Sequence, residues 1–292
     1  MILLEVDASF ENLRLDKFLC KQFDISFGIA QKTIRAKKVK VNGTRVDGAY
    51  KIEEGDQIEI FADLKTRIHR EKQKPKISDE KRKKFASWIV FEDENLMAIN
   101  KPSGLAVQGG SGIELSVDDF LFGKELQLVH RLDKDTSGLL LIAKNAKAAE
   151  ILTNHFRNKT IHKTYFALVE GSPKKEDKVI NIPLLKKLVG KQEKVRPDHL
   201  DGKEAITHFK LVESYMDFAL VELNPVTGRT HQLRVHCKEI GHPVVNDVKY
   251  GGRAVIRKDV CKRMCLHAYR IVIDDYFGQK LEIQTELPEF MS

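Results

Sequence analysis

The sequence has no apolar run approaching the roughly 20 residues that a helix needs to cross a bilayer. Its first residues, 1–7, carry acids where an export signal would carry a basic segment. Both absences exclude the usual signs of membrane insertion or secretion. We therefore expect a cytoplasmic protein without membrane contact.

Cysteine is scarce as well, with four residues at Cys20, Cys237, Cys261 and Cys265. Their scatter forms no disulfide framework, which fits a reducing compartment. Cys261 and Cys265, followed by His267, suggest a metal site, but this spacing is not that of a zinc finger or ribbon. The sequence therefore predicts no metal site.

A glycine-rich phosphate loop is also missing. Residues 109–112 read Gly-Gly-Ser-Gly, but they lack the Gly-x-x-x-x-Gly-Lys pattern and open no obvious helix. We therefore expect no nucleotide cofactor. A hydrophobic content of 42% and a charged content of 32% are typical of a globular chain, and 292 residues suffice for two domains.

The net charge of +8 is concentrated in one segment. Residues 65–84 hold ten Lys/Arg against three acids, whereas residues 1–64 hold ten against eleven. The basic segment has too few apolar residues to pack a core, which predicts a flexible linker that is either simply solvated or adds affinity for phosphates. The predicted organisation is a small domain at 1–64, this linker, and a large domain at 85–292.

The small domain combines helices with short strands. Residues 15–23 and 29–36 have helical apolar spacing, and residues 39–43 alternate before an Asn-Gly turn. The second helix and the following strand carry a cluster of cations without an acid, at Lys32, Arg35, Lys37, Lys38 and Lys40. Charge alone fits a solvated face equally well. The order of elements resembles the S4 RNA-binding domain, which implies an α/β module whose cations contact RNA.

The large domain has the pattern of a mixed α+β fold. Residues 88–95 and 96–101 predict two strands joined by an acidic turn. Asn145 is a suitable N-cap for a helix at 146–158, and residues 161–169 predict a further strand. We expect a mainly antiparallel sheet with flanking helices.

The run His-Arg-Leu-Asp-Lys-Asp-Thr-Ser-Gly at 130–138 places Asp133 between Arg131 and Lys134, on a polar turn before an apolar strand. Neighbouring cations favour the ionised carboxylate and suit a polyanionic substrate. Such a carboxylate can act as a nucleophile or a base. Taken alone, Asp133 or Asp135 is more simply an Asx-turn or hairpin residue.

A second dense motif, Thr-Gly-Arg-Thr-His-Gln-Leu-Arg-Val-His, covers residues 227–236. Thr227 or Thr230 is expected to cap a helix that ends at Gly241. Arg229 would then lie at the start of this helix, where the dipole does not favour a cation, so we expect a carboxylate partner for it.

Three other side chains of the large domain have ordinary structural interpretations. His231 and His236 are five residues apart, which points them in different directions on a helix and makes them hydrogen-bonded packing residues rather than metal ligands. Tyr165, in the strand at 161–169, is by itself a cross-strand aromatic.

Asp133, Tyr165 and Arg229, each in its motif, resemble in order and context the RluA-type family of RNA pseudouridine synthases. The resemblance covers roughly residues 85–285 and implies the α+β pseudouridine-synthase fold. Within the family, the layout is most similar to members acting on large-subunit (23S) ribosomal RNA. The resemblance extends to Asn100–Gly104, Pro243, Val244, Asp247, Tyr250–Gly252 and Leu266–Ala268.

The resemblance implies the isomerisation of uridine in RNA, in which the C1′–N1 bond breaks, the uracil turns and C5 joins C1′. Asp133 would be the catalytic carboxylate, acting as nucleophile or base. Tyr165 would stack on a flipped-out base, and Arg229 would pair with Asp133. Arg131 would fill the vacated space or hold a flanking phosphate. The expected partner is 23S ribosomal RNA or its assembly intermediates, bound by a monomer without a cofactor.

Two other functions fit parts of the sequence. A nucleoside or RNA glycosylase would use water and often a second carboxylate, but the two acids of the 130–138 run are only two residues apart. An RNA-binding assembly factor with an inactive catalytic domain would not need Asp133, Tyr165 and Arg229 together.

Overall fold

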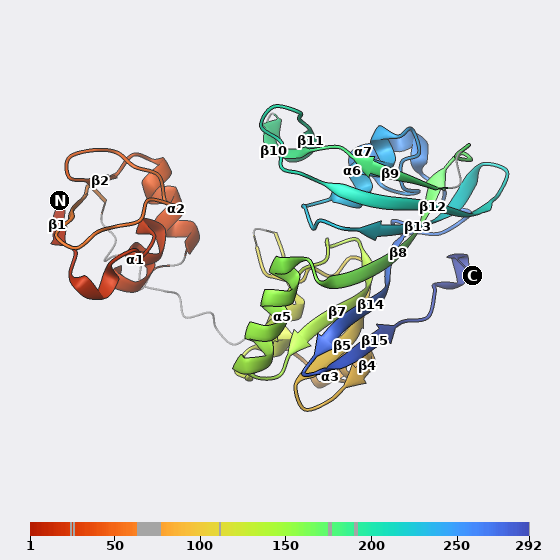
Figure 1. The fold of residues 1–292 in the computed structure, drawn as a ribbon, viewed down its shortest axis with the longest axis horizontal. Helices are drawn as coiled ribbons and strands as arrows, with labels where there is room; N and C mark the ends of the chain where they lie inside the picture. Colours follow the sequence, from red (N-terminus) through yellow and green to blue (C-terminus); the bar gives the residue numbers. More distant parts are fainter. Residues whose placement is uncertain are drawn as a thin grey trace. The chain divides into compact units, whose positions relative to one another are not determined.

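The computed structural model describes residues 1–23, 25, 27–62, 77–110, 112–174, 177–189 and 192–291. The chain divides into two units, Met1–Pro75 and Lys76–Ser292 (Figure 1). Each unit has its own buried apolar cluster. In the described part, no helix is both long and apolar enough to span a membrane.

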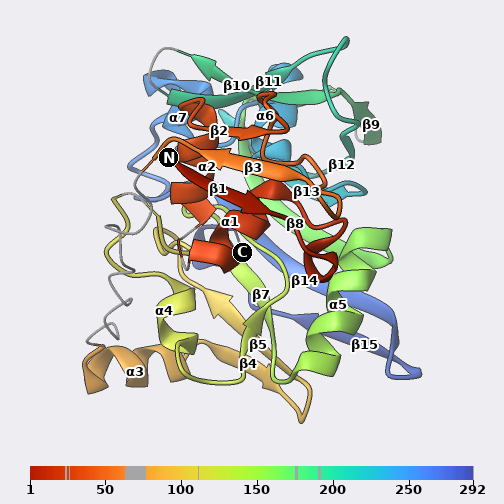
Figure 2. The same cartoon turned by 90° about the vertical axis from the view of Figure 1, so that its left-hand side faces the viewer.

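The smaller unit packs two helices against a three-stranded antiparallel sheet of order β1-β3-β2 (Figure 2). The predicted helices are confirmed, because Phe18, Leu19 and Ile34 enter the core. Asn42 and Gly43 have φ values of 50° and 75°, which form the predicted tight turn. Across the turn the strand pairs only through Val41 with Thr44, and its main partner is β3. The elements are β1 (Ile2–Glu5), α1 (Leu15–Phe23), α2 (Phe27–Arg35), β2 (Val39–Val41) and β3 (Gln57–Ile60).

The larger unit contains the predicted mixture of helices and strands. Its first half comprises α3 (Asp79–Ala86), β4 (Ile89–Glu92), β5 (Leu96–Lys101), α4 (Val117–Leu121), β6 (Gln127–Leu128), β7 (Ser137–Ala143), α5 (Ala146–Asn158) and β8 (Ile161–Glu170). Its second half comprises β9 (Asp177–Asn181), β10 (Leu184–Val189), β11 (Gln192–Pro197), β12 (Ile206–Ser214), β13 (Phe218–Pro225), α6 (Gln232–Glu239), α7 (Val248–Gly251), β14 (Leu266–Tyr276) and β15 (Gln279–Gln284).

A ten-stranded sheet organises the larger unit, with the main order β4-β5-β7-β14-β8-β13-β12-β9. Among its described strand pairs, only β7 and β14 run parallel. Helix α5 packs on β7 and β14 through Ala148 and Leu152, whereas α6 packs on β8 and β13 through Leu233 and Cys237. Figure 1 shows these two helices on different parts of the sheet. The predicted mainly antiparallel α+β architecture is confirmed.

The helices cover the sheet where the apolar periodicity predicted them. Helix α5 spans the predicted range, and the Asn145 side chain accepts a hydrogen bond from Ala148 N as the expected cap. Gly241 ends α6 with a φ of 87°, which a glycine adopts without strain.

The predicted linker at 65–84 requires a correction. Its residues 65–76 lie outside the described residues, but residues 79–84 belong to helix α3. Ser78 caps this helix, acids lie in its first turn and lysines in its last, which suits the helix dipole. One buried apolar residue, Phe85, anchors the helix by stacking on Phe120 at 4.8 Å. A charge count cannot detect such a short, singly anchored helix.

Strand β7 fixes the turn that carries Asp133. All seven residues of β7 are buried, and Asp133 O accepts a hydrogen bond from Thr136 N at 3.2 Å just before the strand. Gly138 has a φ of 105° and packs so closely on β14 that an added Cβ would lie 2.1 Å from Ala268 O. Only glycine fits this position.

Replacing Gly138 with alanine should lower the unfolding free energy of the larger unit by about 3 kcal/mol or more, because the new methyl group collides with backbone and the φ is unfavourable. Trp88 is the single tryptophan and lies in this unit, so its fluorescence in a urea titration reports the effect. Gly109→Ala is the control, since its Cβ would meet nothing closer than 3.9 Å. Equal midpoints for both variants would contradict the expected clash.

Candidate active site

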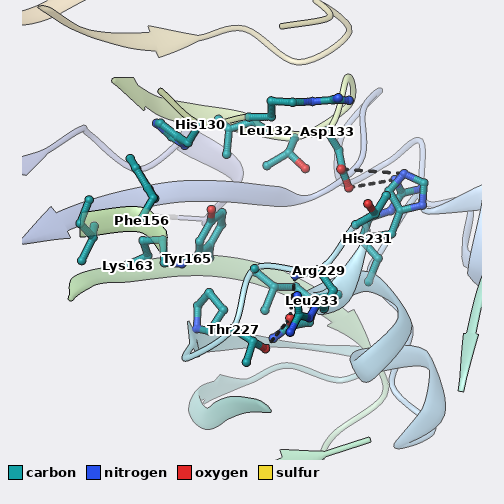
Figure 3. A pocket seen from close by; sticks show the side chains of 18 of the residues that line it. His130, Leu132, Asp133, Phe156, Lys163, Tyr165, Thr227, Arg229, His231 and Leu233 are labelled. Atoms are coloured by element: carbon teal, nitrogen blue, oxygen red, sulfur yellow. Dashed lines mark hydrogen bonds and ion pairs between the residues drawn. The ribbon is translucent and has the colours of Figure 1, made fainter. Parts of the chain in front are cut away.

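A cavity of about 770 Å³ in the larger unit collects the residues that the sequence motifs indicated. Asp133, Tyr165, Arg229 and Arg131 all line it, although they are separated by as many as 98 positions (Figure 3). They come from the turn before β7, from β8 and from the loop between β13 and α6. The fold therefore brings the predicted residues of this unit together.

Asp133 is the centre of the polar side of this cavity. Its Oδ2 accepts a hydrogen bond from Arg234 Nη1 at 3.3 Å, and its Oδ1 lies 3.8 Å from His231 Nε2. The carboxylate keeps 22% of its side chain exposed, so a substrate can reach it. Among the described lining residues it is the only carboxylate.

Lys101 holds the backbone next to Asp133 by a hydrogen bond to the carbonyl oxygen of Lys134. This lysine is fully buried, and its Nζ donates to the carbonyl oxygens of Pro102, Leu105 and Lys134 at 2.9, 2.8 and 3.1 Å. Burial lowers the pKa of Lys101 to about 7, although the charges of Asp135 and Asp133 oppose this shift. Three carbonyl acceptors satisfy all three donors of the ammonium group. Lys101 thus fixes the turn without itself lining the cavity.

The predicted pair of Arg229 with Asp133 is wrong. The Arg229 side chain donates through Nε to Glu204 O at 2.9 Å, and its backbone N donates to Gln232 Oε1. Helix α6 begins later than expected, at Gln232, so Arg229 stays in the preceding loop. Arg234, on the first turn of the helix, is the cation that reaches Asp133.

The predicted threonine cap of α6 is also wrong. The N-cap residue is His231, whose φ of 53° lies in the left-handed region and whose side chain makes no capping bond. Thr227 is buried and donates its hydroxyl hydrogen to Gln232 Oε1 at 2.7 Å. Because α6 begins at Gln232, Arg234 lies in its first turn and faces the cavity. Arg234 could have been identified from the sequence only if the start of this helix had been predicted correctly.

Arg234 is held by a second carboxylate behind it. Its Nε and Nη2 donate to Asp247 Oδ2 and Oδ1 at 2.8 and 2.7 Å, a two-pronged pair in which both side chains are buried. Burial alone would lower the pKa of Arg234. Its hydrogen bonds and electrostatic attraction to Asp247, together with a contribution from Asp133, outweigh burial and raise this pKa. The guanidinium therefore stays charged and oriented, and its third nitrogen is directed at Asp133.

His231 completes the surroundings of Asp133. Mainly because the ring is largely buried, the pKa of His231 is lowered to about 4. The ring is therefore neutral at neutral pH. The Tyr250 hydroxyl accepts from Val195 N at 3.3 Å and is thus available to donate to His231 Nδ1, 2.6 Å away. This assignment leaves the ring proton on Nε2, facing Asp133. His231 is hydrogen-bonded as predicted, but it also lines the cavity, which its sequence position did not indicate.

His236 differs from His231 and matches its prediction. It is fully buried, with Nδ1 2.9 Å from Thr207 Oγ1 and Nε2 3.1 Å from Ile182 O. It therefore bonds the core side of α6 to neighbouring strands and has no access to the cavity lining.

Tyr165 lies on β8 and forms part of an apolar wall with Phe156 and Leu233. In Figure 3 its hydroxyl points across the cavity toward the segment that carries Leu132. Burial, assisted by the charge of Asp133, raises the pKa of Tyr165. The phenol is therefore protonated at neutral pH and presents a flat apolar face with one polar end.

At the far end of the cavity no described lining residue is an acid, and the half-buried Lys163 is one of its cations. Burial lowers the pKa of Lys163. His130 accepts from Leu141 N at 2.8 Å and stacks on Phe156 with 4.5 Å between ring centroids. Burial also lowers the pKa of His130 to about 3, so it is a neutral wall residue.

The residues weighed as a metal site do not converge. Cys261 Sγ lies 2.8 Å from Cys265 Sγ, but His267 is bonded to Ser137 Oγ and Thr285 Oγ1 instead. In the described part of the chain no group of three or more His, Cys, Asp or Glu residues has a metal-binding arrangement.

The cations predicted to contact RNA in the smaller unit occupy the end of α2, the turn that follows it and β2. Most are exposed: Lys32, Arg35, Lys37 and Lys38. Lys40 is half-buried, with its Nζ 5.5 Å from the centre of the Phe61 ring. None of the five forms an ion pair with another described residue.

Known proteins resemble this chain in both units. The model of the RNA pseudouridylate synthase family matches residues 95–239, and that of the S4 domain matches residues 13–58. Ribosomal large subunit pseudouridine synthase C of Vibrio cholerae is 38% identical over 97% of this chain and 92% of its own. The protein of the same name from Rickettsia felis is 37% identical over 96% and 94%.

A solved structure agrees with these sequence relatives. Human RNA Pseudouridylate Synthase Domain Containing 4 is 28% identical, with a TM-score of 0.59 over 72% of this chain and 92% of its own. The extent of these matches shows that the chain belongs to the RNA pseudouridine synthase family and carries an S4 domain at its N-terminal end.

Proposed function

We propose that this chain converts uridine to pseudouridine in large-subunit (23S) ribosomal RNA, with Asp133 as the catalytic carboxylate. The supporting observation is a cavity whose single described carboxylate is held by a buried arginine and whose wall includes a protonated tyrosine. The names of the two bacterial relatives support the choice of RNA.

Each step of this isomerisation has a residue suited to it. The target uridine leaves its stack to enter the cavity, which costs a few kcal/mol and favours loops or strained sites. Asp133 then attacks or deprotonates the nucleotide while the C1′–N1 bond breaks. C5 joins C1′ and loses its proton, N1 gains a proton, and Asp133 returns to its free carboxylate. Arg234 fixes the direction of Asp133, and Tyr165 stacks on the detached uracil so that it turns without leaving.

Two other arginines that line the cavity, Arg131 and Arg229, are proposed to contact the RNA rather than the reacting atoms. Arg131 is exposed beside Asp133 and can fill the space of the flipped base or hold a phosphate. Arg229 is hydrogen-bonded to Glu204 O and therefore does not orient Asp133. Its positive charge suits a substrate phosphate.

A glycosylase is the less favoured enzyme. It would need a water and commonly a second carboxylate on the other side of the sugar. Asp133 has no such partner among the described lining residues, and Phe156, Leu132 and Leu233 make the cavity partly apolar. Exclusion of water protects the broken glycosidic bond from hydrolysis.

We propose that the reaction proceeds in the cytoplasm, in a monomer without a cofactor.

Replacing Asp133 with asparagine should abolish pseudouridine formation and leave RNA affinity nearly unchanged, because the amide keeps the shape but loses the negative charge. The measurement is carbodiimide-blocked primer extension on ribosomal RNA from cells that make the native chain, the variant or neither. Stops present only with the native chain identify the targets. Stops that persist with the variant, or a variant that loses RNA binding in parallel, would contradict the catalytic role.

The S4 domain is proposed to hold structured RNA through Lys32, Arg35, Lys37, Lys38 and Lys40. They lie in a helix-strand segment and form no ion pair with described residues. Contacts of this type position the RNA by shape and backbone and do not take part in the chemistry.

Reversing three of these charges, in the variant K32E/R35E/K38E, should raise the Kd for unmodified ribosomal RNA without slowing conversion at saturating RNA. The salt dependence of binding should also become shallower, since fewer phosphates are neutralised. The matched control K21E/R45E/K51E changes the same charge at exposed positions of the same unit. Equal losses in both variants would refute a specific role for the α2–β2 cations.

A further inference from the structure

A second cavity, of about 950 Å³, meets the first at the catalytic carboxylate. Asp133, His231 and Arg234 line both cavities, so this ion-paired cluster forms the boundary between them. Beyond it, the second cavity is bordered by α7 and by the segment 256–264. The Asp133 turn contributes its other side through Lys134 and Asp135.

The lining of the second cavity is strongly positive. Three carboxylates face it, but Asp133 and Asp247 are already paired with Arg234, which leaves Asp135. The other cations come from three separate segments of the chain: Lys134, Lys249, Lys258, Lys262 and Arg263. The four lysines are exposed and form no ion pair with any described residue. Their charge is therefore available to a ligand.

Lys249 stands close to other cations of this cavity. Partial desolvation of its ammonium group, followed by repulsion from Arg234 and Lys194, lowers the pKa of Lys249, although attraction to Asp133 and Asp247 opposes this shift. Its Nζ also lies 5.9 Å from the centre of the Tyr250 ring. A negative group placed between Lys249 and its cationic neighbours would remove the repulsion and stabilise the ammonium.

We propose that this second cavity binds the phosphodiester backbone of the RNA strand on one side of the target uridine, with Lys249, Lys258 and Lys262 as phosphate contacts. The inference rests on the proposed function, because the strand must pass the Asp133 boundary to deliver its base to the first cavity. The size of the cavity and the distribution of its cations over separate segments suit a chain of phosphates better than one small anion.

These lysines would act on binding and not on the chemical step. A phosphate contact fixes the position of the strand but carries no sequence information. Loss of the three contacts should therefore raise the KM for RNA by about ten-fold or more at physiological salt and leave kcat unchanged. The slope of log K against log salt should become shallower by about 2, because each phosphate contact on a single strand contributes about 0.7.

The test compares K249E/K258E/K262E with the control K124E/K210E/K280E, which makes the same charge change at exposed positions that border neither cavity. Both are studied in the full chain, with Trp88 fluorescence to verify folding. The substrate is an unmodified large-subunit ribosomal RNA transcript made with uridine tritiated at C5, since tritium is released when C5 bonds to C1′. Binding of the same transcript is measured separately by filter retention across a salt series.

Selective weakening of RNA binding in K249E/K258E/K262E, with a shallower salt slope, would support the inference. Equal RNA binding by the two triple variants, with equal salt slopes, would overturn it. If the native chain released no tritium, the proposed function would fail, and the filter assay would still decide whether the lysines bind RNA.

Discussion

The guanidinium group of Arg234 connects Asp133 and Asp247, the two carboxylates on which the geometry of the proposed active site depends. It forms two short bonds to Asp247 and a longer one to Asp133. A buried arginine that loses its partner leaves an uncompensated charge at a cost of about 3–5 kcal/mol, so the folded state strongly favours the pair with Asp247. Once this pair is fixed, the direction of the nitrogen that faces Asp133 is fixed as well.

The fold serves this arrangement by presenting three distant segments at one place. The Asp133 turn precedes the fully buried β7, Arg234 lies on α6, and Asp247 caps α7. Each segment has its own anchor: the turn is held by Lys101, α6 by its apolar face on the sheet, and α7 by the bond of the Tyr250 hydroxyl to Val195 N. The Asp133 carboxylate is therefore positioned by contacts within the protein itself, without RNA.

The sequence predicted the parts of this structure that depend on local pattern. Apolar periodicity and a good cap located α5 to the residue, and the alternation of β8 placed Tyr165 on a strand. The Asp133 turn was recognisable because its motif is contiguous. The choice between Arg229 and Arg234 failed because it depended on where α6 begins, and His231 starts that helix in a left-handed conformation that no capping preference predicts. The contacts of His231 with Asp133 and of Asp247 with Arg234 join separate segments, which local patterns do not encode.

The central claim is that Arg234 positions Asp133 by geometry and not only by charge. The most direct measurement is the single-turnover rate of tritium release by Arg234→Lys at saturating RNA. Lysine keeps the positive charge but cannot bond both carboxylates at once in the forked geometry of arginine. We expect the rate to fall by about 100-fold with unchanged RNA affinity, as for other small misplacements of a catalytic group. A variant that reacts at the native rate would contradict the account.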